Sequence, residues 1–365
     1  MRTLRIERLI RPHLANSNIE TYDPVEPPEI LAAKAGVPKD RIIKLNGNEN
    51  PYGGSAKVAQ AIIRTPLHVY PDPLQRSVRS ALSSYTGLDD EHIIAGAGSD
   101  ELIDLLFRLF VSPGEIVIDC EPTFGMYSFC AAVAGAETIT IQRDDAFEID
   151  ADAIAAAVRP ATKIIFVSSP NNPTGNLASE VQIKALLETG VLVVVDEAYY
   201  EFGRNTVVDL VRTYENLVVL RTMSKWAGLA GLRVGYGIMS PTLVKHIIDI
   251  KSPYNVSTAA EAALIASIED VRVLLEKVEL IIEERDRMST LLDGISGIRT
   301  WPSAGNFILC EFDSGIVNNI YEGLASRGIF VRKFANERLK NHLRISVGIP
   351  EQTDAVVRAL GEMLQ

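Results

Sequence analysis

The chain has 365 residues, of which 47% are hydrophobic and 23% are charged, and its formal net charge is −11. This composition predicts a soluble globular protein with one large and one smaller domain, and the acidic balance argues against a nucleic-acid-binding surface. No apolar run is long enough to span a bilayer, and the first residues lack a signal-peptide core. The three cysteines lack metal-ligand spacing, so we expect a cytoplasmic protein without a metal site: Cys120, Cys130 and Cys310.

Residues 1–45 are polar and rich in proline, which predicts an N-terminal arm with at most one short helix, at 28–35. We expect this arm to form part of the smaller domain. From 46 to 257, short β-branched runs alternate with helical segments, as expected for the large domain. The clearest predicted strands are 115–119, 163–168, 191–196, 216–220 and 234–238. Several are apolar at consecutive positions, which indicates a mainly parallel sheet buried on both faces.

Residues 258–365 are expected to form the smaller α+β domain. It would contain a long helical stretch, 259–292, and strands near 307–311 and 343–347. In the large domain, a further helix is predicted over 100–110, before Ser112-Pro113-Gly114. Large α/β sheets bind ligands beyond the carboxyl ends of their strands. We therefore expect the motifs that follow the apolar runs to converge on one site.

The segment 222–233 is the most informative part of the sequence. Lys225 comes soon after the apolar run 216–220, so its amine can point into a crevice at the sheet edge. Thr222, Ser224 and Arg233 offer two hydroxyls and a guanidinium, a set that suits a phosphate. An amine beside such a group indicates a Schiff-base lysine that carries pyridoxal phosphate (PLP). Taken alone, the same pattern is also compatible with a surface lysine in a glycine-rich turn.

Two upstream motifs bear on this choice. The turn 169–175 contains two prolines and a glycine, and it can fix the amide of Asn172 at the sheet edge. Asp196 ends the next apolar run, where an aspartate could bind a metal, cap a helix or pair with a buried cation. Metal binding lacks companion ligands in the sequence. A carboxylate that faces a pyridinium nitrogen is the functional interpretation.

The motifs N-P-T-G, D-x-x-Y, S-K and G-x-R occur in this order. Asn172, Asp196, Lys225 and Arg233 are separated by 24, 29 and 8 positions. In these motifs the chain resembles the fold-type I PLP-dependent aminotransferases, and within them it is similar to the histidinol-phosphate aminotransferase family, from about Tyr22 to the C-terminus. The resemblance implies an α/β fold with a mainly parallel seven-stranded sheet in the large domain and a smaller α+β domain. It also implies a PLP cofactor and a homodimer with shared active sites.

Position by position, the resemblance implies roles around the cofactor ring. Lys225 would be the Schiff-base lysine and proton carrier, and Asp196 the partner of the pyridine nitrogen. Tyr199 and Asn172 would hydrogen-bond the ring 3-oxygen. Phe124 occupies the position of the aromatic residue that stacks on the ring, although a core aromatic residue is equally compatible with the sequence.

The resemblance also implies a phosphate cradle. Its members would be Ala97, Gly98, Ser99, Thr222, Ser224 and Arg233. The first three form a small-residue loop at the start of the predicted helix, where free backbone N–H groups and the helix dipole favour an anion. Tyr70 matches a tyrosine that reaches the phosphate in the neighbouring subunit, so the active site would need a dimer.

The sequence departs from the family pattern directly after the lysine. The family usually has Ala-Phe-Gly there, whereas this chain has Trp226-Ala227-Gly228. We expect the tryptophan to alter local packing. Because Lys225 and Arg233 stay in place, the cofactor prediction is unaffected.

Arginines and tyrosines are implied at the substrate. Arg344, flanked by apolar residues, would bind the α-carboxylate with help from Asn172, and Arg332 would bind a distal phosphate. Each arginine could instead be an ordinary surface residue. The resemblance places three further residues at the substrate: Tyr22 from the arm, Tyr254 from the partner subunit, and Asn48 at the domain junction.

The reaction implied is transamination between histidinol phosphate and 2-oxoglutarate, giving imidazole acetol phosphate and glutamate, a step of histidine biosynthesis. Alternatives on the same scaffold are an aromatic amino-acid aminotransferase and a threonine-phosphate decarboxylase. A non-catalytic regulator or scaffold is disfavoured because the lysine, the aspartate and both arginines are all present. Arg332 discriminates best, since a phosphate-bearing substrate needs it and an aromatic substrate does not.

Overall fold

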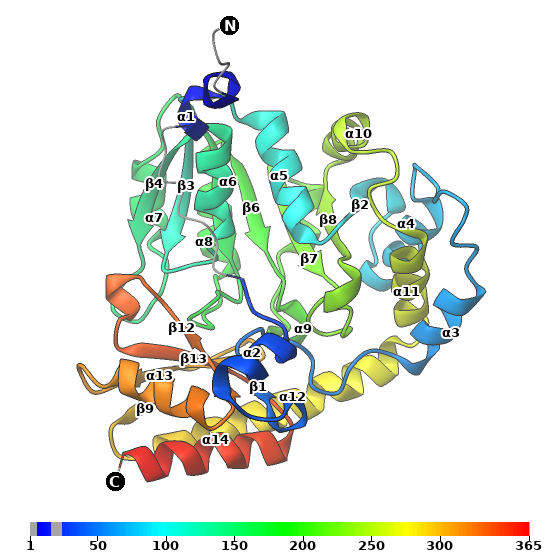
Figure 1. Ribbon diagram of the computed structural model, residues 1–365. Helices are drawn as coiled ribbons and strands as arrows, with labels where there is room; N and C mark the ends of the chain where they lie inside the picture. Colours follow the sequence, from blue (N-terminus) through cyan, green and yellow to red (C-terminus); the bar gives the residue numbers. More distant parts are fainter. Residues whose placement is uncertain (1–5, 16–23, 365) are drawn as a thin grey trace, which may run out of the picture.

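A computed structural model describes residues 6–15 and 24–364. The largest element of the fold is a seven-stranded sheet with helices on both faces. A smaller unit lies beyond the carboxyl ends of the parallel strands of this sheet (Figure 1). In spatial order the strands are β2 (Ile93–Gly96), β8 (Gly235–Met239), β7 (Leu217–Thr222), β6 (Leu192–Asp196), β5 (Thr162–Ser168), β3 (Ile116–Glu121) and β4 (Glu137–Gln142). Only β8 runs against the others. The predicted mainly parallel sheet is therefore confirmed.

Both faces of the sheet are buried, which explains the consecutive apolar residues of its strands. On β6, Val193 and Val195 belong to one hydrophobic core, and Val194 belongs to the core on the other face. Since successive side chains of a strand point to opposite faces, each strand has to supply apolar groups at every position. The five predicted strands coincide with β3, β5, β6, β7 and β8 to within two residues at each end.

Helices connect the strands and cover the two faces (Figure 1). They are α3 (Ala56–Arg64), α4 (Arg76–Thr86), α5 (Ser99–Phe110), α6 (Met126–Ala134), α7 (Ala151–Ala156), α8 (Glu180–Leu187), α9 (Tyr200–Gly203) and α10 (Pro241–Ile250). Short 3-10 helices are η1 (Ile6–Leu9), η2 (Lys39–Arg41), η3 (Asp90–His92), η4 (Val208–Arg212), η5 (Ala230–Leu232) and η6 (Glu337–Leu339). No helix within residues 6–15 and 24–364 is both long and apolar enough to cross a membrane.

The smaller unit is built on a four-stranded antiparallel sheet. Its strands, in spatial order, are β12 (Arg332–Lys333), β13 (His342–Ser346), β10 (Phe307–Phe312) and β9 (Ile298–Thr300). The helices α13 (Val317–Ser326) and α14 (Pro350–Met363) pack on it. Near the N-terminus, β1 (Ile43–Lys44) pairs in parallel with β11 (Ile329–Phe330), so residues that precede the large sheet also join this unit.

Two helix predictions need correction. The stretch 259–292 is not one helix but two, α11 (Thr258–Ile268) and α12 (Val271–Asp293). Between them, the Asp270 backbone leaves the helical conformation, while its carboxylate accepts a hydrogen bond from Ser55 at 2.5 Å and pairs with Lys57 at 3.1 Å. The N-terminal arm contains two helices rather than at most one, because α1 (Pro12–Ala15) precedes the predicted α2 (Pro28–Ala35). Pro12 suits the first turn of α1, where its missing N–H costs nothing.

The hydrophobic core on one face of the large sheet allows a prediction about stability. Phe166 is 1% exposed and stacks on Phe107 and on Tyr127, with centroid distances of 5.6 Å and 4.6 Å. We expect Phe166→Ala to cost about 3–5 kcal/mol, because it removes an aromatic ring and leaves a cavity. The measurement is the urea midpoint of unfolding. The matched control is Val181→Ala at a 78% exposed position, which should change the midpoint little. Equal midpoints for the two variants would contradict this packing.

Candidate active site

A cavity of about 240 Å³ lies where the carboxyl ends of β5, β6 and β7 face the smaller unit. The predicted residues that line it are Asn48, Ser99, Phe124, Asn172, Asp196, Tyr199, Thr222, Ser224, Lys225, Arg233, Arg332 and Arg344. They come from segments that are far apart in the sequence. The parallel sheet therefore gathers the motifs at one edge, as expected for this kind of fold.

Asp196 supplies a buried carboxylate at the end of β6. It is 4% exposed, accepts a hydrogen bond from the Tyr127 hydroxyl at 2.8 Å, and accepts another from the Ala198 amide at 3.0 Å. Burial raises the pKa of Asp196 to about 6, and the two hydrogen bonds oppose this rise. A carboxylate in this position is ready to pair with a cationic group that enters the cavity.

Lys225 lies in the same cavity, and its amine donates to the Gly47 carbonyl at 3.1 Å. Burial, together with the positive charge of Arg344, lowers the pKa of Lys225 to about 8. A larger fraction of this amine is therefore neutral near physiological pH than for an ordinary lysine. Neutral amine is the form that attacks a carbonyl and takes up a proton.

Asn48 connects the loop after β1 to both parts of the molecule. Its side-chain amide donates to the Tyr199 hydroxyl at 2.9 Å, and its carbonyl oxygen accepts from the Ser346 hydroxyl at 2.8 Å. The backbone of Asn48 has φ 52°, a left-handed conformation that asparagine tolerates better than most residues. Asn48 thus fixes Tyr199 at the end of the large sheet relative to β13 of the smaller unit.

Ser99 opens α5 at one end of the cavity, and Arg233 lies beside it. One Arg233 Nη donates to Asp100 at 2.8 Å, and the other reaches the Ser224 hydroxyl at 3.5 Å. Gly98 has φ 81°, and a Cβ there would lie 2.7 Å from the guanidinium. The free N–H groups at the start of a helix, two hydroxyls and a guanidinium form a set of donors that suits a phosphate.

Two arginines form the wall opposite the sheet. Arg344 on β13 donates to the Asn172 side-chain carbonyl at 2.6 Å and to the Asn46 backbone carbonyl at 2.7 Å. Arg332 on β12 is its direct partner in the antiparallel register. Two neighbouring guanidinium groups provide positive charge for two anionic groups of a substrate.

Five predicted residues are not among those that line the cavity: Ala97, Gly98, Tyr70, Tyr254 and Tyr22. The amide of Ala97 donates to the Glu101 carboxylate at 2.6 Å, one residue before the Gly98 that abuts Arg233. Tyr70 and Tyr254 stack on one another with centroids 4.4 Å apart, and they are 77% and 46% exposed. Tyr22 lies outside the described residues.

Tyr127 is a functional residue that sequence reasoning missed. Its ring is fully buried between Phe166 and the site, and its hydroxyl holds Asp196. The spacing of Phe124 and Tyr127, three residues apart at the start of a helix, was the available signal, because such residues share a face. Their rings do meet edge to face, with centroids 5.7 Å apart.

Trp226 does not enter the cavity. It is fully buried behind Lys225, where its ring stacks on Tyr85 with centroids 5.3 Å apart, and its carbonyl accepts from Asn50 at 2.8 Å. The tryptophan therefore belongs to the core and does not line the cavity.

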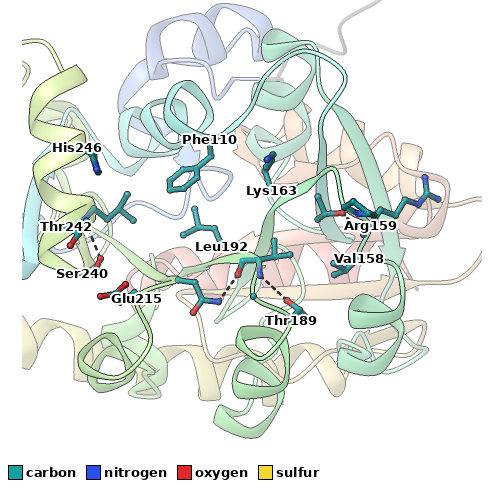
Figure 2. A pocket seen from close by; sticks show the side chains of 16 residues that line it. Phe110, Val158, Arg159, Lys163, Thr189, Leu192, Glu215, Ser240, Thr242 and His246 are labelled. Atoms are coloured by element: carbon teal, nitrogen blue, oxygen red, sulfur yellow. Dashed lines mark hydrogen bonds between the residues drawn. The ribbon is translucent and has the colours of Figure 1, made fainter.

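A larger cavity of about 800 Å³ lies elsewhere (Figure 2). Its walls include the segments that precede β5, β6 and β7, so it sits at the amino ends of those strands. Ligands of α/β sheets bind at the opposite edge. Apart from Arg159, Lys163, Glu215 and His246, its lining is apolar or weakly polar, and we assign it no role in catalysis.

The residues of the smaller cavity fit PLP. The cofactor needs an amine for a Schiff base, a carboxylate for its pyridinium nitrogen, a donor for its 3-oxygen and a cationic phosphate site. The cavity contains all four kinds of group, on Lys225, Asp196, Tyr199 and Arg233. The space that Gly98 leaves beside the guanidinium, where a side chain would clash, supports the phosphate end of this assignment.

Comparisons with known proteins agree with this fold. Residues 40–360 match the model of the family "Aminotransferase class I and II", so the chain belongs to that family. A histidinol-phosphate aminotransferase of Roseiflexus castenholzii is 45% identical over 98% of this chain and 99% of its own length. The chloroplastic histidinol-phosphate aminotransferase 1 of Arabidopsis thaliana is 44% identical, over 97% of this chain and 85% of its own.

A solved structure gives the same result. The histidinol-phosphate aminotransferase of Sinorhizobium meliloti, in complex with pyridoxal-5′-phosphate, superposes with a TM-score of 0.88, at 27% identity over 97% of both chains. The chain belongs to the histidinol-phosphate aminotransferase family.

The burial of Asp196 predicts a cost in stability. A folded-state pKa of about 6, against an ordinary value of 3.8, means that the folded state releases this proton less readily than the unfolded chain. Stability is therefore lost as the pH rises from about 4 through about 6, by roughly 3 kcal/mol in all. We expect Asp196→Asn to stabilise the cofactor-free protein at pH 8, with a gain that shrinks below pH ~6.

Urea unfolding of the cofactor-free proteins at pH 5 and pH 8 measures this effect. Asp209→Asn, at a side chain that is 81% exposed, is the control and should behave like the unmodified protein. An Asp196→Asn variant that is no more stable than the unmodified protein at pH 8 would show that the carboxylate is not strained by burial.

Proposed function

We propose that the protein transfers an amino group between histidinol phosphate and 2-oxoglutarate, giving imidazole acetol phosphate and glutamate in histidine biosynthesis. When bound, PLP supplies a conjugated ring that accepts the electrons left at the substrate α-carbon. The observation that carries the substrate assignment is that Arg332 and Arg344, paired on adjacent strands, both line one cavity. This reaction requires a site that accepts both a phosphate and a carboxylate.

The residues of the large sheet hold and move protons. Lys225 Nζ would hold the cofactor and would take the proton from the substrate α-carbon. Its lowered pKa keeps part of the amine neutral and able to accept this proton. The Asp196 carboxylate, which the Tyr127 hydroxyl orients, would keep the ring nitrogen of the cofactor protonated. Tyr199 and Asn172 would donate hydrogen bonds to the ring oxygen.

The residues of the smaller unit orient the substrate. Arg344, steadied by Asn172, binds the α-carboxylate of glutamate or 2-oxoglutarate. Arg332 binds the phosphate of histidinol phosphate. Asn48 connects the large sheet to the smaller unit, because its side chain bonds both Tyr199 and Ser346.

The alternatives differ in the charges that they bring. An aromatic amino acid carries one anionic group and leaves Arg332 without a role. Threonine phosphate carries both a carboxylate and a phosphate, so the arginine pair does not discriminate against it. A non-catalytic scaffold gives no reason for a half-buried lysine whose pKa is lowered to about 8.

Steady-state kinetics with histidinol phosphate, phenylalanine and threonine phosphate test the substrate. We expect kcat/KM to be highest for histidinol phosphate. Arg332→Gln should lower it by about 10–100-fold for this substrate, because a charge-assisted bond of about 1.5–3 kcal/mol is lost. The same change should affect phenylalanine much less. A large preference for phenylalanine, or carbon dioxide release from threonine phosphate, would refute the assignment.

We also propose that the protein is a homodimer with shared active sites. Support comes from the exposed apolar surface around Tyr70 and Tyr254, which includes Ile63, Leu67 and Val69 at 51–75% exposure. Such a patch on a protein of this size favours an interface. In the dimer, Tyr70 would reach the phosphate of the partner's cofactor, and Tyr254 would approach the partner's substrate.

The three cysteines are buried free thiols, which supports a reducing compartment such as the cytoplasm.

Subunit mixing tests the shared site. Tyr70→Ala and Lys225→Ala should each lower the activity of the homodimer that carries the change in both chains. After refolding of a 1:1 mixture, half of the dimers are mixed and each has one complete site, so about a quarter of full activity should return. Activity that stays at the sum of the two variants would mean that Tyr70 acts within its own chain or not at all.

A further inference from the structure

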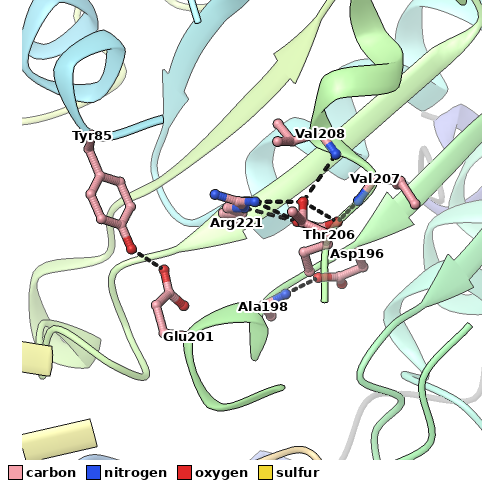
Figure 3. Close-up of polar contacts among 9 residues, drawn as sticks. Tyr85, Asp196, Ala198, Glu201, Thr206, Val207, Val208 and Arg221 are labelled. Carbon is pink, nitrogen blue, oxygen red and sulfur yellow. Dashed lines mark hydrogen bonds and ion pairs between the residues drawn. The ribbon is translucent and has the colours of Figure 1, made fainter. Parts of the chain in front are cut away.

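A buried ion pair lies next to the active site but takes no part in the mechanism above. Arg221 and Glu197 are 3% and 1% exposed, and the Arg221 Nε and Nη2 donate to one Glu197 oxygen at 3.0 Å and 2.8 Å. The Thr206 hydroxyl and the Val207 amide also donate to this carboxylate, and Figure 3 shows the contacts of Arg221 and Thr206. The pair therefore has the additional hydrogen bonds that a buried ion pair requires.

Each member of the pair adjoins a residue of the cofactor site in the sequence. Glu197 follows Asp196 at the end of β6, and Arg221 precedes Thr222 at the end of β7. The two strands are neighbours, and the Glu197 amide donates to the Leu220 carbonyl at 2.8 Å. Because side chains alternate along a strand, Asp196 and Thr222 project to one face and the ion pair to the other.

The same side of the sheet also holds the residue that follows Lys225. Trp226 stacks on Tyr85, whose hydroxyl donates to Glu201 at 3.0 Å (Figure 3). Glu201 is buried, and the positive charge of Arg221 opposes the rise that burial causes in its pKa. One network of charged residues therefore packs behind the ends of β6 and β7 and behind the loop that contains Lys225.

Stability alone does not account for these charges. Apolar residues of similar volume usually stabilise a core as well as a buried ion pair does, because removing two charges from water is costly. A guanidinium that holds a carboxylate through two N–H groups differs from an apolar contact in fixing direction as well as distance. Here it fixes the relative position of two strand ends.

We propose that Glu197 and Arg221 are positioning residues, whose ion pair holds the ends of β6 and β7 so that Asp196 and Thr222 meet the cofactor in fixed places. This inference rests on the proposed PLP-dependent function. It assigns the pair no contact with the cofactor or the substrate.

Cofactor binding to the cofactor-free proteins tests the inference. Arg221→Lys keeps the charge but loses the two-pronged geometry, so it should fold and bind PLP about tenfold more weakly. The double variant Glu197→Gln/Arg221→Gln removes both charges of the pair, and Glu201 keeps its hydrogen bond from Tyr85. This variant should unfold near the temperature of the unmodified protein and still bind PLP about tenfold more weakly. Absorbance titration gives the Kd, and thermal unfolding gives the stability.

Kinetics of the reconstituted proteins separate positioning from general loosening. With Asp196 and Thr222 displaced, kcat should fall about tenfold, while KM changes by less than about threefold, because Arg332 and Arg344 are untouched. The control is Glu180→Gln, which removes an exposed ion pair with Lys184 (2.6 Å) and should leave Kd, kcat and stability unchanged.

The inference is overturned if Arg221→Lys, or a stable double variant, binds PLP and turns over as the unmodified protein does. If the double variant does not fold, Arg221→Lys decides, since its buried charges remain balanced. The Kd is measured without substrate, so an error in the proposed substrate does not affect it. Failure of the unmodified protein to bind PLP would instead refute the proposed function.

Discussion

The buried carboxylate of Asp196 is the charge on which the site depends. Burial at the end of β6 raises its pKa to about 6, and the hydrogen bonds from Tyr127 and Ala198 limit that rise. Burying the carboxylate lowers the stability of the protein. An ionised carboxylate in an apolar setting, however, would pair strongly with a protonated ring nitrogen of the cofactor. The aromatic core of Phe107, Phe166 and Tyr127 holds the donor hydroxyl in place.

The direction of the strands explains why the other groups lie near this charge. The turn with Asn172, the Asp196–Tyr199 segment and the lysine loop each follow a parallel strand, so they meet at one edge of the sheet. The smaller unit closes this edge with two paired arginines. Asn48, bound to both Tyr199 and Ser346, couples the two units at the cavity itself.

The sequence was sufficient where a local pattern determines the outcome. Consecutive apolar runs predicted the buried strands, and polar residues after these runs predicted that Asn172, Asp196 and Lys225 converge at one site. Other lining residues, such as Arg332 and Arg344, were implied only by the resemblance to a known family. The sequence was insufficient where a contact with a residue far away in the chain determines the local structure. The break at Asp270 depends on Ser55 and Lys57, more than 200 residues earlier. The contact between Tyr127 and Asp196 likewise joins two elements that no local pattern connects.

We infer that Lys225, in the same cavity as Asp196, is the residue that binds the cofactor covalently. Borohydride reduction of the protein with bound PLP, followed by peptide mass spectrometry, tests it directly, because reduction makes the lysine–cofactor bond permanent. We predict one pyridoxyl group per chain, on the peptide that contains Lys225. A label on another lysine, or no stable label, would show that Lys225 does not bind the cofactor covalently.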